Sequence, residues 1–295
     1  MASSRLIRGR IKSAKNIAQI TKAMEMVSAS KMRRAQALAL SGKFYAQKIY
    51  DAVYELAKGT DPKNHPLLIR NLQSDKTLVI LITTNKGLCG SLNTNLFRAA
   101  LKWFTPSSKF DFIVLGKKGE SFVVRAQYRL MAAFGLKESF LSTVSPVISL
   151  AISEYLQGNY KEIMIVYNNF INALKQEPAK KTILPVGVAG LVDIDEETDY
   201  SDFLIEPSSE ELFEALLPHY LENQVREAIL ESEASEHSAR MIAMKNATDN
   251  ASDLLKDLTL EYNRPGRKKS PPKFPTWSQP EWPLVSKLFI KKMYE

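Results

Sequence analysis

The chain has almost no cysteine and no long apolar run. Its 295 residues include a single cysteine, Cys89, which excludes an internal disulfide and a cysteine-rich metal site and favours a reducing compartment. The longest purely apolar runs, such as Leu78–Ile82, fall far short of the roughly 20 residues that cross a bilayer. Because Met1–Arg10 has no apolar core, we predict neither a transmembrane helix nor a cleaved targeting segment. We also predict no metal site, since the histidines lie far apart and in no ligand spacing (His65, His219 and His237).

Glycine and proline are missing from long stretches at both ends of the chain. Neither occurs between Ile11 and Ser41, between Lys43 and Lys58, or from His219 to Arg264. Because these residues are the ones that most often end or kink a helix, we predict helical arms over residues 1–58 and 208–264. We place the start of the second long helix after Pro218. At about 1.5 Å per residue, the stretch from His219 to Arg264 extends about 70 Å. A helix of that length must either pair along its length or protrude from a domain.

Acidic residues are nearly absent from the first arm. Glu25 is the only acid among residues 1–50, and the basic residues there are Arg5, Arg8, Arg10, Lys12, Lys15, Lys22, Lys31, Arg33, Arg34, Lys43 and Lys48. A long basic helix has three common uses: it pairs with a second helix, binds nucleic acid, or lies on an anionic membrane surface. A solvated face without a special partner is the fourth alternative. The formal net charge of +8 favours acidic partners.

Both arms carry apolar stripes at helical spacing. In the first arm, Ile17, Ile20, Met24 and Val27 recur at steps of three and four and share one face. Alanines keep much of the remaining surface slim, so a second helix can approach (Ala14, Ala18, Ala23 and Ala29). The stripe of the second arm, which serine and asparagine dilute, comprises Val225, Ile229, Ala239, Ile242, Ala243, Ala247, Ala251, Leu254 and Leu258. We predict an antiparallel coiled coil with Met24 and Val27 on the seam against residues 238–264.

The middle of the chain, residues 59–207, alternates apolar strands with short helices. We predict strands over residues 77–83, 110–116, 162–170 and 180–187, with a turn near Pro178, and helices over 93–104, 118–125 and 145–158. This alternation is typical of an α/β sheet of four to six strands. Residues 187–207 are acidic and read as a connection that leaves the sheet. The predicted fold class is therefore α/β, a central sheet domain flanked by long N- and C-terminal helices that form the coiled coil.

The loop NKGLCG, residues 85–90, follows a predicted strand, where phosphate loops and nucleophile elbows occur. It has neither the spacing of a phosphate loop, nor a dinucleotide fingerprint, nor the Gly-x-Ser-x-Gly elbow. A nucleophilic Cys89 needs a histidine base, and no nearby sequence supplies one. We therefore interpret the loop as a tight strand-to-helix turn and predict no cofactor and no catalytic residue.

The segment KMRRAQ offers Arg33 and Arg34 to nucleic-acid phosphates. No aromatic or glycine-rich companion marks an RNA-binding module, and basic-zipper proteins have no α/β domain between their helices. A basic coiled-coil protein that binds nucleic acid is thus the second reading of the sequence. An enzyme that uses the α/β domain is the third.

Three segments together resemble the gamma subunit of F-type ATP synthase, in its bacterial type. They are ITKAMEMVSASKMRRAQ at residues 20–36, NKGLCGSLN at 85–93 and SARMIAMKNATDNASDLLKDLTLEYNR at 238–264. The resemblance implies a non-catalytic rotor shaft inside a ring of alpha and beta subunits, with an α/β foot near the epsilon subunit and the membrane c-ring. It implies no nucleic-acid partner and no direct insertion into the membrane, but a peripheral place at the cytoplasmic face of a bacterial plasma membrane.

The resemblance also implies roles for individual residues. It places Met24, Lys31, Arg33 and Arg34 in contact with the catalytic subunits, whose lever loops are acidic in this family. Arg240 is assigned to the same rotor–stator contacts. Contacts of the foot are assigned to its loop, which comprises Gly87, Leu88, Cys89 and Gly90.

After Arg264 the sequence departs from the family. Members continue the helix with a pattern resembling R-x-R-Q-x-x-I-T-x-E-I-x-x-I-V, whereas residues 265–295 begin PGRKKSPPKFP, whose prolines exclude a helix. Back-translation with freely chosen synonymous codons, read from the third base of the Arg264 codon, allows A-R-Q-E-K-I-T-A-E-I over Pro265–Phe274. We therefore hypothesise that one base was lost near that codon and that residues 265–295 are not native family sequence. We expect the second helix to end near Arg264 and the tail to be poorly ordered.

Overall fold

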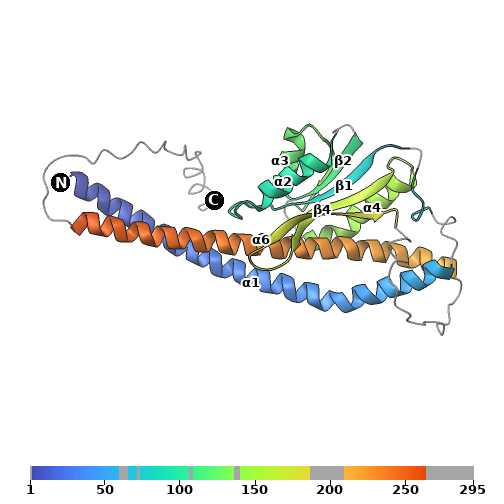
Figure 1. Cartoon of the computed structure of the whole chain (residues 1–295), viewed down its shortest axis with the longest axis horizontal. Coiled ribbons are helices and arrows are strands. Elements are labelled where there is room, and N and C mark those ends of the chain that lie inside the picture. Colours follow the sequence, from blue (N-terminus) through green and yellow to red (C-terminus); the bar gives the residue numbers. More distant parts are fainter. Residues whose placement is uncertain are drawn as a thin grey trace.

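Two long helices run the length of the molecule, and an α/β domain packs against one half of the pair (Figure 1). The computed structural model describes residues 2–59, 66–71, 74–105, 109–135, 140–186 and 209–263. We call the helix pair the shaft and the α/β domain, residues 66–186, the foot. The predicted tail (265–295), the acidic connection (187–207) and His65 lie outside the described residues.

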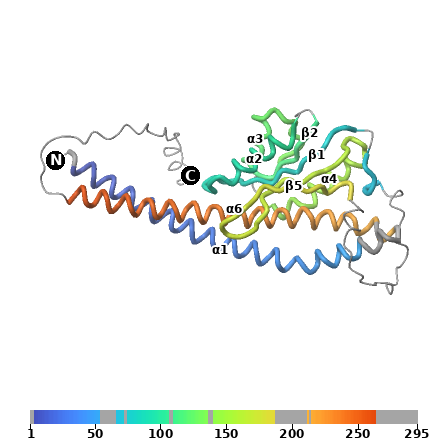
Figure 2. Tube along the Cα trace, in the orientation of Figure 1, coloured from blue at the N-terminus to red at the C-terminus, as the bar shows by residue number. Residues whose placement is uncertain are grey.

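The shaft consists of α1 (Ala2–Gly59) and α6 (Ser209–Asn263). The helices are antiparallel, so the start of α1 lies beside the end of α6 (Figure 2). The Thr21 and Thr248 hydroxyls are 2.7 Å apart. Nearer the tip, the Arg8 guanidinium donates a hydrogen bond to the Tyr262 hydroxyl and lies 5.4 Å from the centre of its ring. The antiparallel coiled coil predicted from the sequence is confirmed.

The foot is built on a five-stranded sheet with the order β3-β2-β1-β4-β5. The strands are β1 (Thr77–Ile82), β2 (Phe110–Leu115), β3 (Arg129–Phe134), β4 (Glu162–Phe170) and β5 (Gln176–Leu184). The first four pair in parallel, and β5 is antiparallel to β4. The connections contain α2 (Leu92–Trp103), α3 (Lys117–Arg125), the 3-10 helix η3 (Phe140–Thr143) and α4 (Val144–Leu156). Helical crossovers of this kind let successive strands run in parallel, and the predicted α/β class is confirmed.

Both faces of the sheet are covered, because successive side chains of a strand point to opposite faces. Leu78, Ile80 and Ile82 of β1 join one core with α4, the lower part of α6 and the end of α1. Val79 and Leu81 of the same strand join a second core with α2 and α3. Since the first core includes residues of both shaft helices, the foot and the lower shaft fold as one unit.

Two details of the sheet differ from the prediction. The strand β3 was missed, and the turn expected near Pro178 lies earlier, over residues 171–175. Pro178 instead sits within β5, opposite Asn168 of β4. The sheet tolerates this proline because β5 is an edge strand, where one row of backbone N–H groups needs no partner strand.

The helix α6 begins before the proline that was read as its starting signal. It starts at Ser209 and continues through Pro218. A proline inside a helix costs about 3 kcal/mol. The neighbouring Leu217 and Leu221 are fully buried in the core that the foot and shaft share, and burying each gains about 1.5–3 kcal/mol. Tertiary burial thus offsets the local cost.

The seam of the shaft also differs from the predicted stripe. Ile49 and Val53, near the end of α1, are buried in the core of the foot. Along the rest of α1 the buried side chains are small, namely Ala14, Ser28 and Ala35. By contrast, Ile17, Ile20 and Val27 are 52%, 60% and 56% exposed, and Met24 is half-buried. Placing Val27 on the seam was therefore wrong, and Met24 lies at its margin. Small side chains allow two helices to approach more closely than isoleucine or valine would.

Candidate functional site: shaft surface and foot junction

The outer face of α1 carries apolar and basic side chains that the described residues leave uncovered. The apolar ones form what we call the outer stripe (Ile17, Ile20 and Val27), and the basic ones form the collar (Lys31, Arg33 and Arg34). Soluble proteins seldom leave neighbouring large apolar side chains exposed unless a partner covers them. The outer face of α1 is therefore a candidate contact surface.

Arg240 joins α6 to the foot, and we call this contact the junction. Its Nε lies 3.3 Å from the Gly87 carbonyl oxygen, and its Nη2 lies 3.2 Å from the same oxygen and 3.4 Å from that of Lys86. Nη2 also donates a hydrogen bond of 2.6 Å to Oε1 of Glu236, one turn earlier. Arg240 is only 7% exposed. Arg240, which the resemblance assigned to rotor–stator contacts, is thus buried between α6 and the foot. There it holds the loop of residues 85–90.

Charges of alternating sign surround the junction. Burial raises the pKa of the Glu236 carboxyl, while the nearby Arg240, Lys31 and Lys86 lower it. Burial, followed by the charges of Arg240 and Lys31, lowers the pKa of His237 to about 4. The imidazole is therefore neutral at neutral pH. Lys31 of the collar thus acts on the same group of α6 side chains as Arg240, although it is exposed.

The loop held by Arg240 presents one apolar side chain to solvent. Leu88 has a φ of 62°, a left-handed conformation that is uncommon outside glycine, and is 53% exposed. The adjacent Cys89 is buried, which raises the pKa of its thiol and disfavours the reactive thiolate. On the side of the loop that faces the foot, the Asn85 side-chain amide donates a hydrogen bond of 2.7 Å to the Gly135 carbonyl oxygen. The loop is thus fixed on the foot side as well as on the shaft side.

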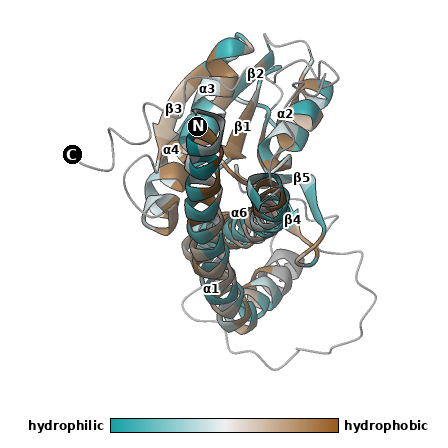
Figure 3. Cartoon of the chain, turned by 90° about the vertical axis from the view of Figure 1, so that its left-hand side faces the viewer, coloured by the Kyte–Doolittle hydropathy of each residue, from teal (hydrophilic) through white to brown (hydrophobic). Residues whose placement is uncertain are grey.

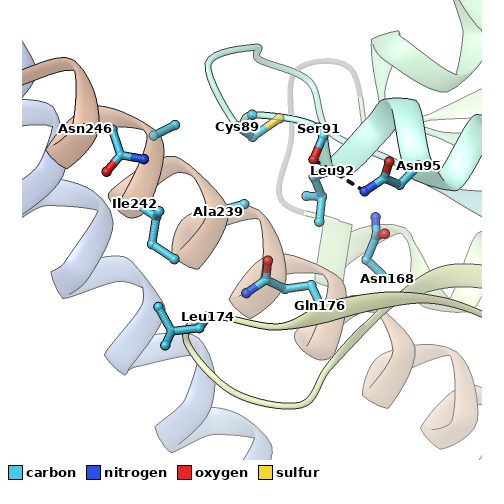
Figure 4. Close-up of a pocket in the computed structure, with 12 residues that line it drawn as sticks. Cys89, Ser91, Leu92, Asn95, Asn168, Leu174, Gln176, Ala239, Ile242 and Asn246 are labelled. Carbon is cyan, nitrogen blue, oxygen red and sulfur yellow. Dashed lines mark hydrogen bonds between the residues drawn. The ribbon is translucent and has the colours of Figure 1, made fainter. Parts of the chain in front are cut away.

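A cleft of about 270 Å³ lies beside the junction, between α6, the start of α2 and the turn after β4 (Figure 4). Its lining is uncharged and includes Gly90, Ser91, Asn95 and Ile242. No base faces the buried Cys89 in this lining. Within the described residues, no three histidine, cysteine, aspartate or glutamate side chains gather as metal ligands. This cleft therefore gives Cys89 no partner for nucleophilic chemistry.

None of the helices in the described part of the chain combines the length and the apolarity that crossing a bilayer requires.

Sequence reasoning missed two side chains that stand with Arg240. Ser235 donates a hydrogen bond of 3.0 Å to the Asn168 carbonyl, and Ser238 donates one of 2.6 Å to that of Ala173. Both serines are fully buried. The available signal was the dilution of the apolar stripe of α6 by serines, which indicated polar contacts but named no partner. Of the predicted site residues, the structure brings together Arg240 and Gly87. It leaves Lys31, Arg33, Arg34 and Leu88 on the surface, with Lys31 close enough to act electrostatically on Glu236 and His237.

Comparison with known sequences gives long matches to one family. A family model described as ATP synthase matches residues 3–268. The ATP synthase gamma chain of Herpetosiphon aurantiacus is 45% identical over 281 residues, covering 90% of this chain and 92% of that protein. The gamma chain of Methylacidiphilum infernorum is 43% identical over 276 residues, with 90% and 93% covered. That of Legionella pneumophila is 36% identical over 273 residues, with the same coverage.

Comparison with solved structures finds the same arrangement of helices and sheet. The rotor of the Euglena gracilis mitochondrial ATP synthase aligns with a TM-score of 0.61 at 24% identity, covering 89% of this chain and 96% of that chain. The central stalk and c-ring structure of the Tetrahymena thermophila enzyme contains a chain that aligns with a TM-score of 0.57 at 26% identity, with 77% and 99% covered. Because the Euglena chain is only 24% identical, its alignment shows a common fold and nothing more.

Proposed function

Because the chain belongs to the ATP synthase gamma chain family, we propose that it is the central rotor shaft of an F-type ATP synthase. The observation that carries the proposal is the rod of two long helices built onto one side of an α/β foot (Figure 1). The rotor couples proton- or sodium-driven rotation of the membrane ring to ATP synthesis in the alpha and beta subunits.

The mechanism follows from the asymmetry of the shaft. One side of α1 presents the outer stripe and the collar, whereas the side that faces α6 is lined with small residues. A shaft with unlike sides presses differently on each of the identical subunits around it. Each subunit is thereby biased toward a different conformation and a different affinity for ADP, phosphate and ATP, which is a shift of population by differential contact.

The proposal assigns surfaces of the chain to partners. The outer stripe, Met24 and the collar face the alpha and beta subunits, and the collar meets acidic loops. The exposed Leu88 at the tip of the loop makes a foot contact, together with Gly87 and Gly90, while the buried Cys89 supports the loop from inside. The foot lies toward the epsilon subunit and the c-ring. Arg240 takes an intrachain role.

The place of the chain follows from those partners. We propose that it is peripheral, held at the cytoplasmic face of a bacterial plasma membrane through the c-ring and without inserting into the bilayer. Washing membranes without detergent should release it together with the head.

Purification through an affinity tag on this chain tests the proposed function. We expect alpha, beta and epsilon subunits to co-purify with it from membranes and to bring ATPase activity that the isolated chain lacks. A nuclease-treated sample should give the same result, which separates the rotor from a nucleic-acid-binding protein. Recovery of the chain without an ATPase head, combined with salt-sensitive retention on DNA, would contradict the proposal.

A further inference from the structure

The last contacts that α6 makes with the foot are polar and lie at one level of the shaft. We propose that Ser235, Ser238 and Arg240 form a clamp that fixes the upper edge of the foot to α6 and sets the point at which the shaft is released as a free coiled coil. Arg240 is its principal positioning residue. The mechanical meaning of the clamp rests on the proposed rotor function, but its existence does not.

Each member of the clamp donates to main-chain carbonyls of a different foot segment. Ser235 reaches Asn168 of β4, Ser238 reaches Ala173 in the turn after β4, and Arg240 reaches Lys86 and Gly87 in the loop after β1. The three segments meet at the carboxyl edge of the sheet, where the neighbouring parallel strands β1 and β4 end. Asn168 is still within β4 and pairs with β5, whereas the loop after β1 and the turn after β4 lie beyond the strands. The clamp therefore ties these two connections to the same stretch of α6 as the end of β4.

The contacts on the two sides of the clamp differ in kind. Below it, Leu221, Val225 and Ile229 of α6 are buried in the core of the foot. Just above it lies the cleft of Figure 4, lined on α6 by Ala239, Ile242 and Asn246. Beyond the cleft, the described hydrogen bonds between α6 and other elements go to α1. The clamp thus marks the boundary between the part of α6 that the foot holds and the part that only α1 accompanies.

Arg240 has chemistry that the serines lack. Its planar guanidinium reaches the Glu236 carboxylate and two loop carbonyls at once, which a single ammonium group on a lysine cannot do. Arg240 is buried and Glu236 is half-buried, whereas Lys86 and Gly87 are exposed. Removing the guanidinium therefore leaves the carboxylate without its donor and leaves the loop carbonyls to water. The loop of residues 85–90, with its left-handed Leu88, then loses its tie to α6.

Hydrogen exchange of backbone amides in the assembled complex tests the clamp. In Arg240→Gln we expect amides of residues 85–91 to exchange about tenfold faster or more, as the loss of a charged hydrogen bond implies. Residues 248–260 of α6 should exchange as in the parent. Arg240→Lys should fall between, because it keeps the charge and loses the fork. The matched control is Arg226→Gln, which changes an exposed arginine of the same helix and should leave the loop unchanged.

The outcomes separate the clamp from a general effect on folding. If loop exchange in Arg240→Gln equals that of the parent, or if it rises only together with exchange along the whole of α6, the clamp is rejected. If Arg240→Gln fails to fold, two milder variants test the clamp. Arg240→Lys should speed the exchange of residues 85–91, and Ser238→Ala should speed that of residues 171–175. Exchange equal to that of the parent in both segments rejects the clamp. Isolated parent and variant chains can be compared in the same way. If the parent never joins an ATPase head, the rotor proposal fails while the clamp is still tested.

The ratio of ion pumping to ATP hydrolysis tests whether the clamp helps to transmit torque. With assembly and ATP hydrolysis intact, Arg240→Gln should give less ATP-driven ion pumping per ATP hydrolysed, because the upper edge of the foot yields under load although the core still holds its lower part to α6. Arg240→Lys should restore part of that ratio, and Arg226→Gln should leave it unchanged. A parental pumping ratio in a variant whose loop exchanges fast would overturn the mechanical part alone.

Discussion

The lower and upper halves of α6 hold their neighbours by different means. The lower half places Leu221, Val225 and Ile229 in the core of the foot, all of them fully buried. The upper half meets α1 through the hydroxyls of Thr21 and Thr248 and through the Arg8–Tyr262 contact. Figure 3 shows brown strands inside the foot and a largely teal or pale α1.

This difference suits the two ends of a rotor. The end that receives torque must be fixed to the foot, and a buried apolar core is the strongest means available within one chain. The other end must turn inside a ring, where a large apolar surface would hold it at one angle. A slim shaft with a small-residue seam and an outer stripe of only a few large side chains limits that effect.

Truncating one leucine in each half should expose the contrast most clearly. Leu221→Ala removes a fully buried side chain and should lower the free energy of unfolding by about 2–5 kcal/mol. Leu258→Ala in the upper half should cost about 1–2 kcal/mol, because exposed neighbours can close over the site. Urea unfolding of the isolated chain measures both. Equal losses would mean that the two halves are held alike.

The seam of the upper half can be tested one residue at a time. Thr21→Val removes one hydroxyl from the pair across the seam and should cost about 1 kcal/mol of unfolding free energy. Ile20→Val, its neighbour on the exposed outer stripe, should cost less than about 0.5 kcal/mol. A larger loss of unfolding free energy for Ile20→Val than for Thr21→Val would mean that the seam is formed by the apolar stripe predicted from the sequence.

The collar should matter for coupling more than for stability. Each exposed ion pair is worth about 0–1 kcal/mol, so single changes should be mild. Replacing Lys31, Arg33 and Arg34 together by glutamine should lower the coupling of ATP hydrolysis to ion pumping at low salt, with a smaller effect at high salt. Normal coupling of the triple variant at low ionic strength would reduce the collar to a solvated face.

The smallest expected effect is a pH dependence at the junction. The pKa of His237 is about 4, below its ordinary value of 6.5. Between these values the unfolded chain binds a proton that the folded chain does not. The stability contributed by the neutral imidazole is therefore complete above pH 6.5 and is lost as the pH falls toward 4. His237→Gln should lose less stability than the parent between pH 7 and pH 5, as urea unfolding at both values would reveal. Equal losses would mean that this imidazole titrates normally.

Parts of this architecture could be predicted because they depend on local sequence. The lack of glycine and proline indicated the long helices, and alternation of apolar strands with helices indicated the α/β domain. Pro218 was misread because burial of its leucine neighbours overrides a local signal. The seam was misread because periodicity favours the largest apolar side chains, whereas close packing of the shaft uses the smallest.

The junction could not be predicted from the sequence. Arg240 and Gly87 are separated by 153 residues, and no local pattern says that a helix in one arm will pass over a loop of the central domain. Glu236 and Arg240 are spaced four apart on α6, a spacing that is equally common for exposed ion pairs. Only the packing of α6 across the carboxyl edge of the sheet makes that pair buried.

The loss of one base near the Arg264 codon remains a hypothesis that rests on the sequence. The family match stops at residue 268 of 295, close to the departure after Arg264. If one base was lost near that codon, the genomic locus should encode a helical family tail, and the native subunit should differ in mass from this sequence. An uninterrupted frame and an intact mass matching the 295 residues would establish a divergent C-terminus instead.

The central claim is that foot and shaft turn together as one rotor inside a catalytic head. Observation of single complexes, with the head fixed to a surface and a bead attached to the exposed Lys102 position of the foot through Lys102→Cys, tests it most directly. On addition of ATP, the bead should rotate in one direction for many turns. Complexes that hydrolyse ATP at the normal rate while the foot-bound bead only fluctuates in place would contradict the account.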